Sequence, residues 1–343
     1  MNKHPVFFFP LMFILFCLNI QSITAQTHYF GTLSNVKQRP LAMGGAFTSV
    51  EDDLEAVLYN PGSFNLYENE KQHRLTIFIN PMSLLIASRH YSENFTEKIE
   101  NTNVLNASAL LFKSVIFTAK FFNAGIILGE ESLNNIRQNE RSSFFSFNDL
   151  WNNCSHTIFS NIQLAPKVSM GLSGTVYYDK TGSTRISKYG FSYGILMKPN
   201  PHINVGLSYI DFPKELPNYR TNLERMFDET MNIGISYRPF PGTTLSVDVR
   251  NLTEENKNNV RELHVGFEQS FFGIISLQGG YFQENYTKNN SYSCGIGLFD
   301  SRLIHKRQNE FGHHNYSLQY SFVYQEEEKG FNRWHFFSLL FHL

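Results

Sequence analysis

The side chains that could carry chemistry in this chain of 343 residues are its twelve histidines and its scattered serines and acidic residues. A metal site would need several of them on one face, and a hydrolase would need a nucleophile beside a base. His313 and His314 are adjacent in a polar stretch, and neighbours in an extended chain point to opposite faces. No Gly-x-Ser-x-Gly, His-Glu-x-x-His or phosphate-loop pattern occurs. We therefore predict a non-enzymatic protein with no metal and no cofactor.

The acidic run and the cysteines add no chemistry of their own. Glu326 to Lys329 lacks the Asp, Asn and Gly spacing of a calcium loop and is predicted to be a solvated turn. Cys154 and Cys294 are far apart, so two unpaired thiols are favoured over one disulfide. The net charge of −1 predicts no nucleic-acid partner.

The N-terminus has the pattern of an export signal. Lys3 and His4 precede the apolar run from Val6 to Ile20, and a polar neck leads to Ala25. This run is too short to span a bilayer and ends in a small residue, which predicts a signal peptide over residues 1–25, cleaved after Ala25. A lipoprotein is a weaker interpretation, because Phe16 precedes Cys17 where a small residue would be needed.

The composition is unusual for a soluble domain. Charged residues make up 17% of the chain, against roughly 25% in a typical soluble domain. Aromatic residues reach 15%, yet no window after residue 25 is apolar enough for a membrane helix. An outer-membrane β-barrel has these properties, because its lipid-facing and lumen-facing residues alternate and cancel in the average. A secreted β-sandwich shares some of them and is the alternative.

From Arg74 onward, segments with alternating apolar and polar residues recur. In residues 231–238, Ile233, Ile235 and Tyr237 alternate with small polar residues, and residues 244–250 repeat the design. Counting all such segments predicts an all-β, transmembrane antiparallel β-barrel of about 14 strands. The further predicted strands are 74–80, 83–91, 107–113, 115–128, 156–165, 168–178, 186–198, 202–210, 263–268, 275–281, 291–299, 315–325 and 334–343.

The connections differ in length. Tight turns are predicted at 198–201, 239–242 and 270–273. Pro199, Pro201, Pro239 and Pro241 all lie at turns, as ladder hydrogen bonding requires. Longer polar loops are predicted at 92–106, 131–150, 212–229, 252–260, 283–290 and 300–313. Barrels of this kind have short periplasmic turns and long exterior loops, so the inserts 131–155 and 212–229 could carry specificity.

The last residues form an alternating aromatic strand. One face carries Phe337, Leu339, Phe341 and Leu343. An exposed apolar edge is an aggregation hazard that barrel closure removes, so this strand favours a barrel over a soluble sheet. It resembles the C-terminal signal by which barrel-assembly machinery recognises outer-membrane proteins.

The segment from Arg39 to Gly62 is the irregular part of the chain. Gly44 and Gly45 permit a bend, and Asp52 or Asp53 is predicted to cap a helical turn over residues 54–59. Asn60, Pro61 and Gly62 end that helix, since a residue before proline avoids helical geometry. A capped helix on the surface would explain the same residues, whereas a compact segment ahead of a strand array is what a plugged barrel needs.

These residues also carry a family resemblance. Arg39, Pro40, Gly44 and Gly45, then Glu51-Asp52-Asp53, then Tyr59-Asn60-Pro61-Gly62 resemble the N-terminal signature of the PorV/PorQ family. That family belongs to the superfamily of fatty-acid-transporter-like (FadL-like) outer-membrane barrels and commonly has Asn-Pro-Ala where this chain has Asn-Pro-Gly. The resemblance implies a short helical N-terminal plug in the barrel lumen. The chain would then consist of the signal peptide, a plug over residues 26–70 and a barrel over residues 71–343.

The resemblance implies two roles and leaves both open. PorV and PorQ proteins are accessories of the type IX secretion system that handle cargo or surface attachment, and FadL-like transporters pass hydrophobic small molecules. We expect a non-enzymatic secretion accessory in the cell outer membrane; a transporter is the alternative, and an envelope protein with only a structural role is a third. The implied partners are outer-membrane lipid, barrel-assembly machinery, and secretion-system or cargo proteins, with a hydrophobic ligand in the transporter alternative.

Overall fold

The computed structural model describes residues 27–29, 36–52, 54–65, 73–81, 111–131, 154–181, 184–213, 216, 230–252, 261–272, 274–283, 289–300, 316–327 and 330–342. The predicted signal peptide, the strand at 83–91, and most of the predicted long loops lie outside these residues.

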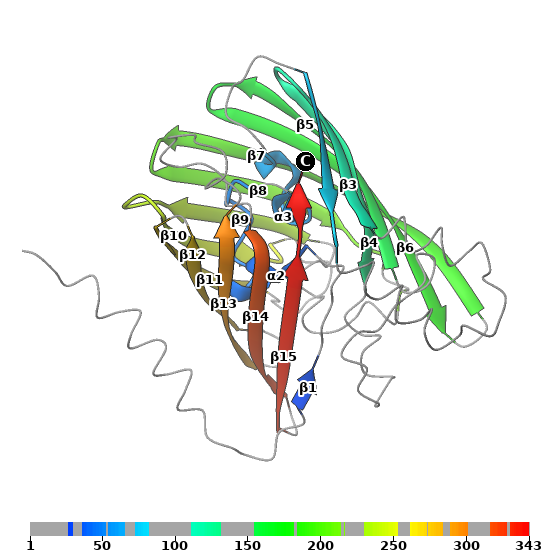
Figure 1. Cartoon of the computed structure of the whole chain (residues 1–343), viewed down its shortest axis with the longest axis vertical. Helices are drawn as coiled ribbons and strands as arrows, with labels where there is room; N and C mark the ends of the chain where they lie inside the picture. Colours follow the sequence, from blue (N-terminus) through cyan, green and yellow to red (C-terminus); the bar gives the residue numbers. More distant parts are fainter. Residues whose placement is uncertain are drawn as a thin grey trace, which may run out of the picture.

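The described chain is almost entirely β-structure (Figure 1). Fourteen antiparallel strands, β2 to β15, each pair with their neighbours in the sequence, which confirms the predicted fold class and strand number. The short elements that precede them are β1 (Thr27–Tyr29), α2 (Gln38–Ala42), α3 (Leu54–Val57) and η1 (Pro61–Ser63). The strands are β2 (Arg74–Ile79), β3 (Phe112–Ala119), β4 (Phe122–Glu131), β5 (Cys154–Ala165), β6 (Val168–Thr181), β7 (Thr184–Asn200), β8 (Ile203–Asp211), β9 (Thr230–Tyr237), β10 (Thr243–Arg250), β11 (Glu262–Phe271), β12 (Ile275–Gln283), β13 (Asn290–Asp300), β14 (Tyr316–Glu327), β15 (Gly330–Leu339) and β16 (Phe341–His342).

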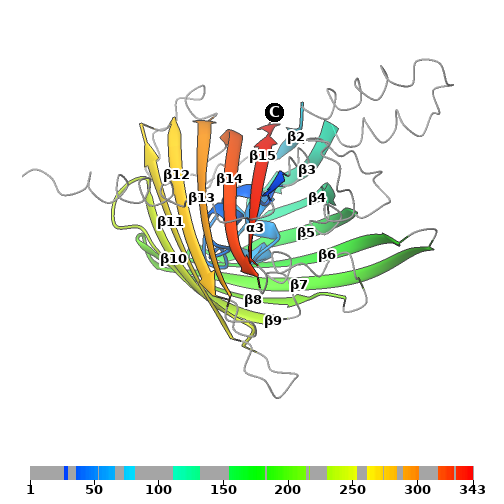
Figure 2. The same ribbon diagram turned by 90° about the horizontal axis from the view of Figure 1, so that it is seen from below.

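The two edges of the sheet meet in the last strand. β15 pairs with β14, and β16, which follows after Leu340, pairs with β2 through Phe341↔Ile79 and His342↔Phe78. β1 pairs in parallel with β15 at Arg333 to His335. The sheet therefore curls into a ring around the N-terminal elements, with a seam beside β2 that only two residue pairs join (Figure 2).

The burial of the strands is inverted relative to a soluble protein. Ile233 and Ile235 are 40% and 52% exposed on the outside of β9, whereas Asn232 and Ser236 are buried on the inside. β10 repeats the pattern, with Leu245 and Val247 outside. An apolar outer face and a polar lumen are what a β-barrel needs to be stable in lipid. Among the helices of the described residues, none has the length and apolar character needed to cross a bilayer.

Four details of the predicted strand map are wrong. The segment at 115–128 is two strands, because Lys120 and Phe121 form a turn that contains neither Gly nor Pro; the predicted strand 107–113 overlaps only the start of β3. Pro199 lies within β7, at a register shift between Met197 and Asn200 where no ladder hydrogen bond is needed from it. Finally, residues 300–313 connect β13 to β14, and antiparallel alternation puts that connection at the same end as the tight turns.

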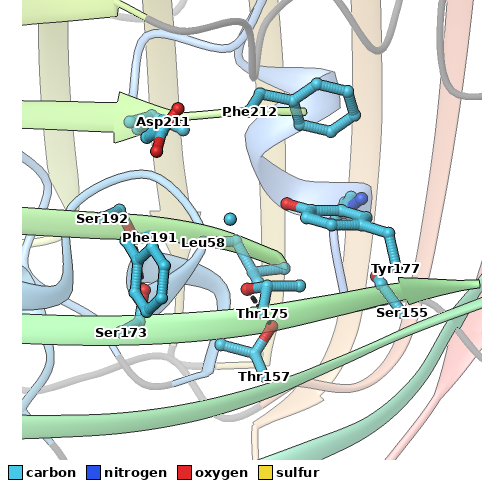
Figure 3. A pocket seen from close by; sticks show the side chains of 13 residues that line it. Leu58, Ser155, Thr157, Ser173, Thr175, Tyr177, Phe191, Ser192, Asp211 and Phe212 are labelled. Carbon is cyan, nitrogen blue, oxygen red and sulfur yellow. Dashed lines mark hydrogen bonds between the residues drawn. The ribbon is translucent and has the colours of Figure 1, made fainter. Parts of the chain in front are cut away.

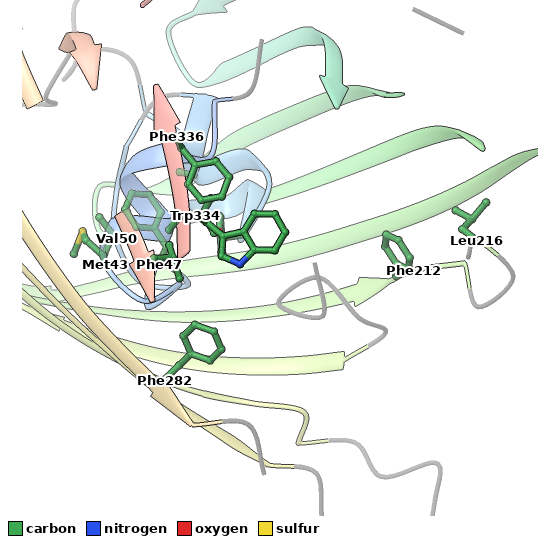
Figure 4. Packing of buried hydrophobic residues seen from close by; sticks show 12 residues of the cluster. Met43, Phe47, Val50, Phe212, Leu216, Phe282, Trp334 and Phe336 are labelled. Atoms are coloured by element: carbon green, nitrogen blue, oxygen red, sulfur yellow. The ribbon is translucent and has the colours of Figure 1, made fainter. Parts of the chain in front are cut away.

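The described residues between 36 and 65, which we call the plug, lie inside the ring (Figures 1 and 2). Nearly all of them are buried. Met43, Phe47, Val50 and Tyr59 pack in one apolar cluster with wall side chains from β8 onward, among them Phe282, Trp334 and Phe336 (Figure 4). A second cluster joins Leu54, Val57 and Phe64 to the inner faces of β2 to β5, at Phe78, Ile116, Ile127 and Phe159. The plug is thus the apolar core of an otherwise polar lumen.

Candidate functional site

Arg39 holds the plug to the wall through buried charges. It lies in α2, is 3% exposed, and its Nε donates to Glu268 Oε2 on β11 at 3.0 Å. Its guanidinium also forms an ion pair with Asp52 of the plug, and Glu55 Oε2 lies 3.9 Å away. The guanidinium carbon of Arg39 lies over the ring of Phe47, 5.2 Å from the ring centroid. Because Asp52 and Glu268 are as buried as Arg39, each depends on it for compensation.

A second set of wall side chains holds the Gly44–Thr48 turn. Asp248 on β10 accepts from the backbone N–H groups of Phe47 and Thr48, both at 2.9 Å. Arg250 donates to the carbonyl of Gly45, and His264 Nδ1 lies 2.6 Å from the carbonyl oxygen of Gly44. The lumen wall therefore supplies partners for backbone groups that no helix or strand would satisfy.

Tyr59 lies near the charges of Arg250 and Asp248. The guanidinium carbon of Arg250 is 5.2 Å from the centroid of the Tyr59 ring. Burial raises the pKa of the Tyr59 phenol, although the nearby Arg250 charge opposes this shift. The phenol therefore stays protonated, and the Tyr59 ring packs in the apolar cluster.

Asn60 and the wall residue Asn161 fix the end of the plug. Asn60 has an extended backbone, φ −156°, and its side chain accepts from the N–H of Gly62 at 2.9 Å. Its Nδ2 donates to Thr48 O at 2.7 Å and to Ile195 O of β7 at 3.1 Å. Asn161 Nδ2 on β5 in turn donates to Pro61 O at 2.9 Å. The Asn-Pro-Gly stop is therefore clamped between β5 and β7.

Glycines in the wall give the plug its closest contacts. A Cβ on Gly171 would lie 2.2 Å from Pro61 C and O, one on Gly206 2.1 Å from Thr48 O, and one on Gly280 2.0 Å from Gly44 N. Real Cβ atoms do not approach so closely, so only glycine fits these positions. Six of the wall glycines form three cross-strand pairs: Gly171↔Gly194, Gly206↔Gly234 and Gly266↔Gly280. The sequence analysis missed this feature, although the recurrence of glycine at inward positions of successive strands could have predicted it.

The start of the plug is anchored by a buried ion pair between β3 and β4. Lys113 Nζ lies 2.6 Å from Glu130 Oε1, and both side chains are buried. Glu130 also accepts from the N–H of Val36 at 3.1 Å. The plug is therefore attached to the wall near both of its described ends.

One small cavity lies between the plug and β5 to β8 (Figure 3). Its volume is about 40 Å³, and its lining includes Leu58 of the plug and Asp211. Wall hydroxyls line much of it, with Thr157 and Thr175 hydrogen-bonded at 2.9 Å and Ser173 bonded to Ser192. A cavity of this size and polarity suits a few water molecules.

The residues singled out in the sequence fall at the following places. Arg39 and Asp52 meet in the ion pair, Pro40 lies in α2, Gly44 and Gly45 have φ +61° and +75°, and Asn60, Pro61 and Gly62 form the clamped stop. The predicted capping role of Asp52 is wrong, because its carboxylate binds Arg39; Asp53 lies outside the described residues.

The residues of the terminal strand and the cysteines lie in the barrel wall. Phe337 and Leu339 are half-buried on the outer face of β15, Phe341 is exposed in β16, and Leu343 lies outside the described residues. Phe337 packs on Tyr320 with 4.7 Å between ring centroids. Cys154 and Cys294 lie on β5 and β13, and neither forms a disulfide bond.

Removing the Asp248 charge should loosen the Gly44–Thr48 turn. In Asp248→Asn one oxygen can still accept, but the charge that strengthens two backbone hydrogen bonds and faces Arg250 at 3.7 Å is lost. We expect the free energy of unfolding to fall by about 1.5–3 kcal/mol, the range for hydrogen bonds to charged groups. Urea unfolding in lipid vesicles measures it; a loss below about 0.5 kcal/mol would contradict the assigned role.

Comparison with known proteins gives matches among solved structures. No family model matches this chain, and no curated protein matches it. Among solved structures, a triple mutant of Rhodopseudomonas blastica porin aligns with a TM-score of 0.36 and 10% identity over 67% of this chain and 76% of the porin. Another mutant of the Rh. blastica porin aligns with a TM-score of 0.35 and 11% identity over the same shares.

Proposed function

We propose that this chain is an exported outer-membrane β-barrel whose lumen is permanently closed by its N-terminal plug, and that it acts as a non-enzymatic accessory of protein secretion or surface attachment. The observation that carries the proposal is the fit between plug and wall at the three glycine pairs. The inverted burial of the strands supports placement in a membrane. The resemblance of Arg39 to Gly62 to the PorV/PorQ signature supports the secretion role.

Within the part of the chain that the structure describes, the plug packs closely on the wall, and this packing favours a role for the exterior loops over passage through the barrel. Ligand pockets for small molecules are usually about 300–1,000 Å³. The cavity beside Leu58 measures about 40 Å³, and its lining combines Ser and Thr hydroxyls with apolar side chains such as Phe191 and Ile210. Cargo or partner proteins would therefore bind outside the barrel, on segments such as 217–229.

A FadL-like transporter of hydrophobic molecules is the second candidate, and one observation favours it. The inner faces of β2 to β5 carry an apolar patch, which belongs to the cluster of Phe78, Ile116 and Ile127. Leu340, at the break between β15 and β16, packs against the same cluster. A hydrocarbon chain could therefore reach apolar side chains near the two-pair seam.

Copurification separates these roles. The protein would be affinity-purified from its native membranes in mild detergent, and bound proteins and lipids would be identified by mass spectrometry. We expect stoichiometric partner proteins that disappear when residues 217–229 are replaced by a Gly/Ser linker of equal length. Phe212 and Leu216 are kept, because both are buried in the apolar cluster. The same replacement at 253–260 is the matched control and should leave the partners bound.

The outcomes exclude one another. A tightly retained hydrophobic molecule without partner proteins would instead support the transporter, and the absence of both would leave a structural envelope protein. The barrel itself predicts a gel mobility that changes on heating. Recovery of the protein in a soluble fraction without detergent would overturn the whole proposal.

A further inference from the structure

Several exposed phenylalanines lie at hairpin tips on one rim of the barrel. Phe121, Phe240 and Phe272 are 53%, 63% and 92% exposed. They belong to the β3–β4, β9–β10 and β11–β12 turns. Antiparallel alternation puts these three turns at the same end as the C-terminus of β15, and Figure 1 shows the hairpin turns along that rim. We call this end the short-turn rim.

The short-turn rim is also cationic. Lys120, Lys167 and Arg238 lie in or beside its turns, and Arg74 begins β2 there. Lys120 Nζ lies 4.7 Å from the ring centroid of Phe121, and Lys167 Nζ donates to Pro199 O at 3.1 Å, so both ammonium groups stay close to the turns.

Few of the described acidic residues lie at this rim. Of the described acidic residues, those at this rim are Asp300, at the end of β13, and Glu51, which forms an ion pair with Lys198. The opposite rim is mixed: Glu130, Asp179, Asp211, Glu262 and Glu326 lie among Lys180, Arg185, Lys188 and Arg261. Among the described residues, a predominantly positive charge and protruding phenylalanine rings therefore occur together at the short-turn rim.

We propose that the short-turn rim binds the headgroups of anionic phospholipids, with its phenylalanine tips inserted between the acyl chains just below the headgroups and its cations on the phosphates. Aromatic rings concentrate at membrane interfaces, and an anionic surface attracts nearby Lys and Arg side chains. A phenylalanine that is 92% exposed at a turn is costly in water, and it is stabilised where lipid covers it. This inference rests on the proposed membrane-spanning barrel.

The test places an indole at the rim. Phe272→Trp would be reconstituted in phosphatidylcholine vesicles containing a fixed fraction of either brominated phosphatidylglycerol or brominated phosphatidylcholine, which quench nearby indoles. Fluorescence is corrected by subtracting the wild-type signal. We expect at least fivefold stronger relative quenching by the anionic lipid, given that each surface cation contributes about fivefold to anionic-lipid association. Leu263→Trp, on the outside of β11 near its other end, should show no headgroup preference.

Charge variants test the cations. Combining Lys120→Gln, Lys167→Gln and Arg238→Gln with Phe272→Trp should abolish the preference while the heat-modifiable barrel still forms. The matched control neutralises Lys180, Arg185 and Lys188 at the opposite rim and should keep the preference. Equal quenching by both lipids in Phe272→Trp, or an unchanged preference in the triple variant, would overturn the proposal.

The remaining outcomes separate this inference from its premise. If the introduced indole is quenched in Leu263→Trp but not in Phe272→Trp, the barrel is in lipid and the rim faces something else, so the inference is wrong. If neither variant is quenched, the barrel is not in the bilayer and the proposed function fails with it.

Discussion

Replacing Arg39 with methionine should lower the free energy of unfolding by about 3–5 kcal/mol, because removing one partner of a buried ion pair leaves the other charge uncompensated. Here two carboxylates lose their partner: Asp52 in the plug and Glu268 on β11, both buried. Methionine has a length similar to the aliphatic part of arginine, so the loss reflects charge more than volume. Reversible urea unfolding in lipid vesicles is the measurement.

Two variants make this result specific. Lys198→Met breaks the ion pair with Glu51, but Lys198 is 26% exposed, so a change of only about 0–1 kcal/mol is expected. Combining Arg39→Met with Asp52→Asn and Glu268→Gln removes all three charges and should restore most of the lost stability. Equal losses from Arg39→Met and Lys198→Met would mean that the Arg39 network does not hold the plug.

The barrel wall could be predicted because its signal is local. Alternation of apolar and polar residues repeats every two positions, so Ile233 and Ile235 were assigned to one face without knowing any neighbour. Local signals fail where a turn contains neither Gly nor Pro. Lys120 and Phe121 interrupt the strands without Gly or Pro, and the aromatic residues on both sides continue the pattern.

The plug contacts could be predicted only in part, because their partners are distant in sequence. Arg39 and Asp52 were singled out individually, and their ion pair spans 13 positions. Glu268 is 229 positions from Arg39, and its place opposite α2 depends on the cumulative register of the whole sheet. Asp52 was named with Asp53 as a candidate cap for the same reason: a nearby helix start is visible in sequence, whereas a buried guanidinium is not.

The wall glycines could be predicted less well than the strands but better than the plug contacts. A glycine inside a strand weakens it and often marks a close approach of another backbone. Gly206 and Gly234 occupy inward positions in two neighbouring predicted strands, so a close approach to the lumen wall could have been inferred. The segment that approaches could not be inferred, since the position of Thr48 beside Gly206 follows only from the folded plug.

Gly171→Ala should therefore be far more damaging than alanine substitution elsewhere on the same strand. Its Cβ would lie 2.2 Å from Pro61 C and O, and these are backbone atoms that cannot rotate away. Either the clamped Asn60–Gly62 stop or β6 must move by more than about 1 Å to reach ordinary contact, and such overpacking costs about 1–3 kcal/mol. We expect the urea midpoint to fall and trypsin to cleave after Lys37 faster than in the wild type.

Gly174 provides the matched control three residues along β6. It faces outward, and the nearest atoms to its Cβ would be ring carbons of Phe191 at 3.7 Å, an ordinary contact. Gly174→Ala should change stability by less than about 0.5 kcal/mol and leave tryptic cleavage unchanged. A plug that is loosely seated would relax around either alanine, and the two variants would then behave alike. Only a plug packed backbone to backbone against β6 separates them, and that packing is what the proposed closure of the lumen requires.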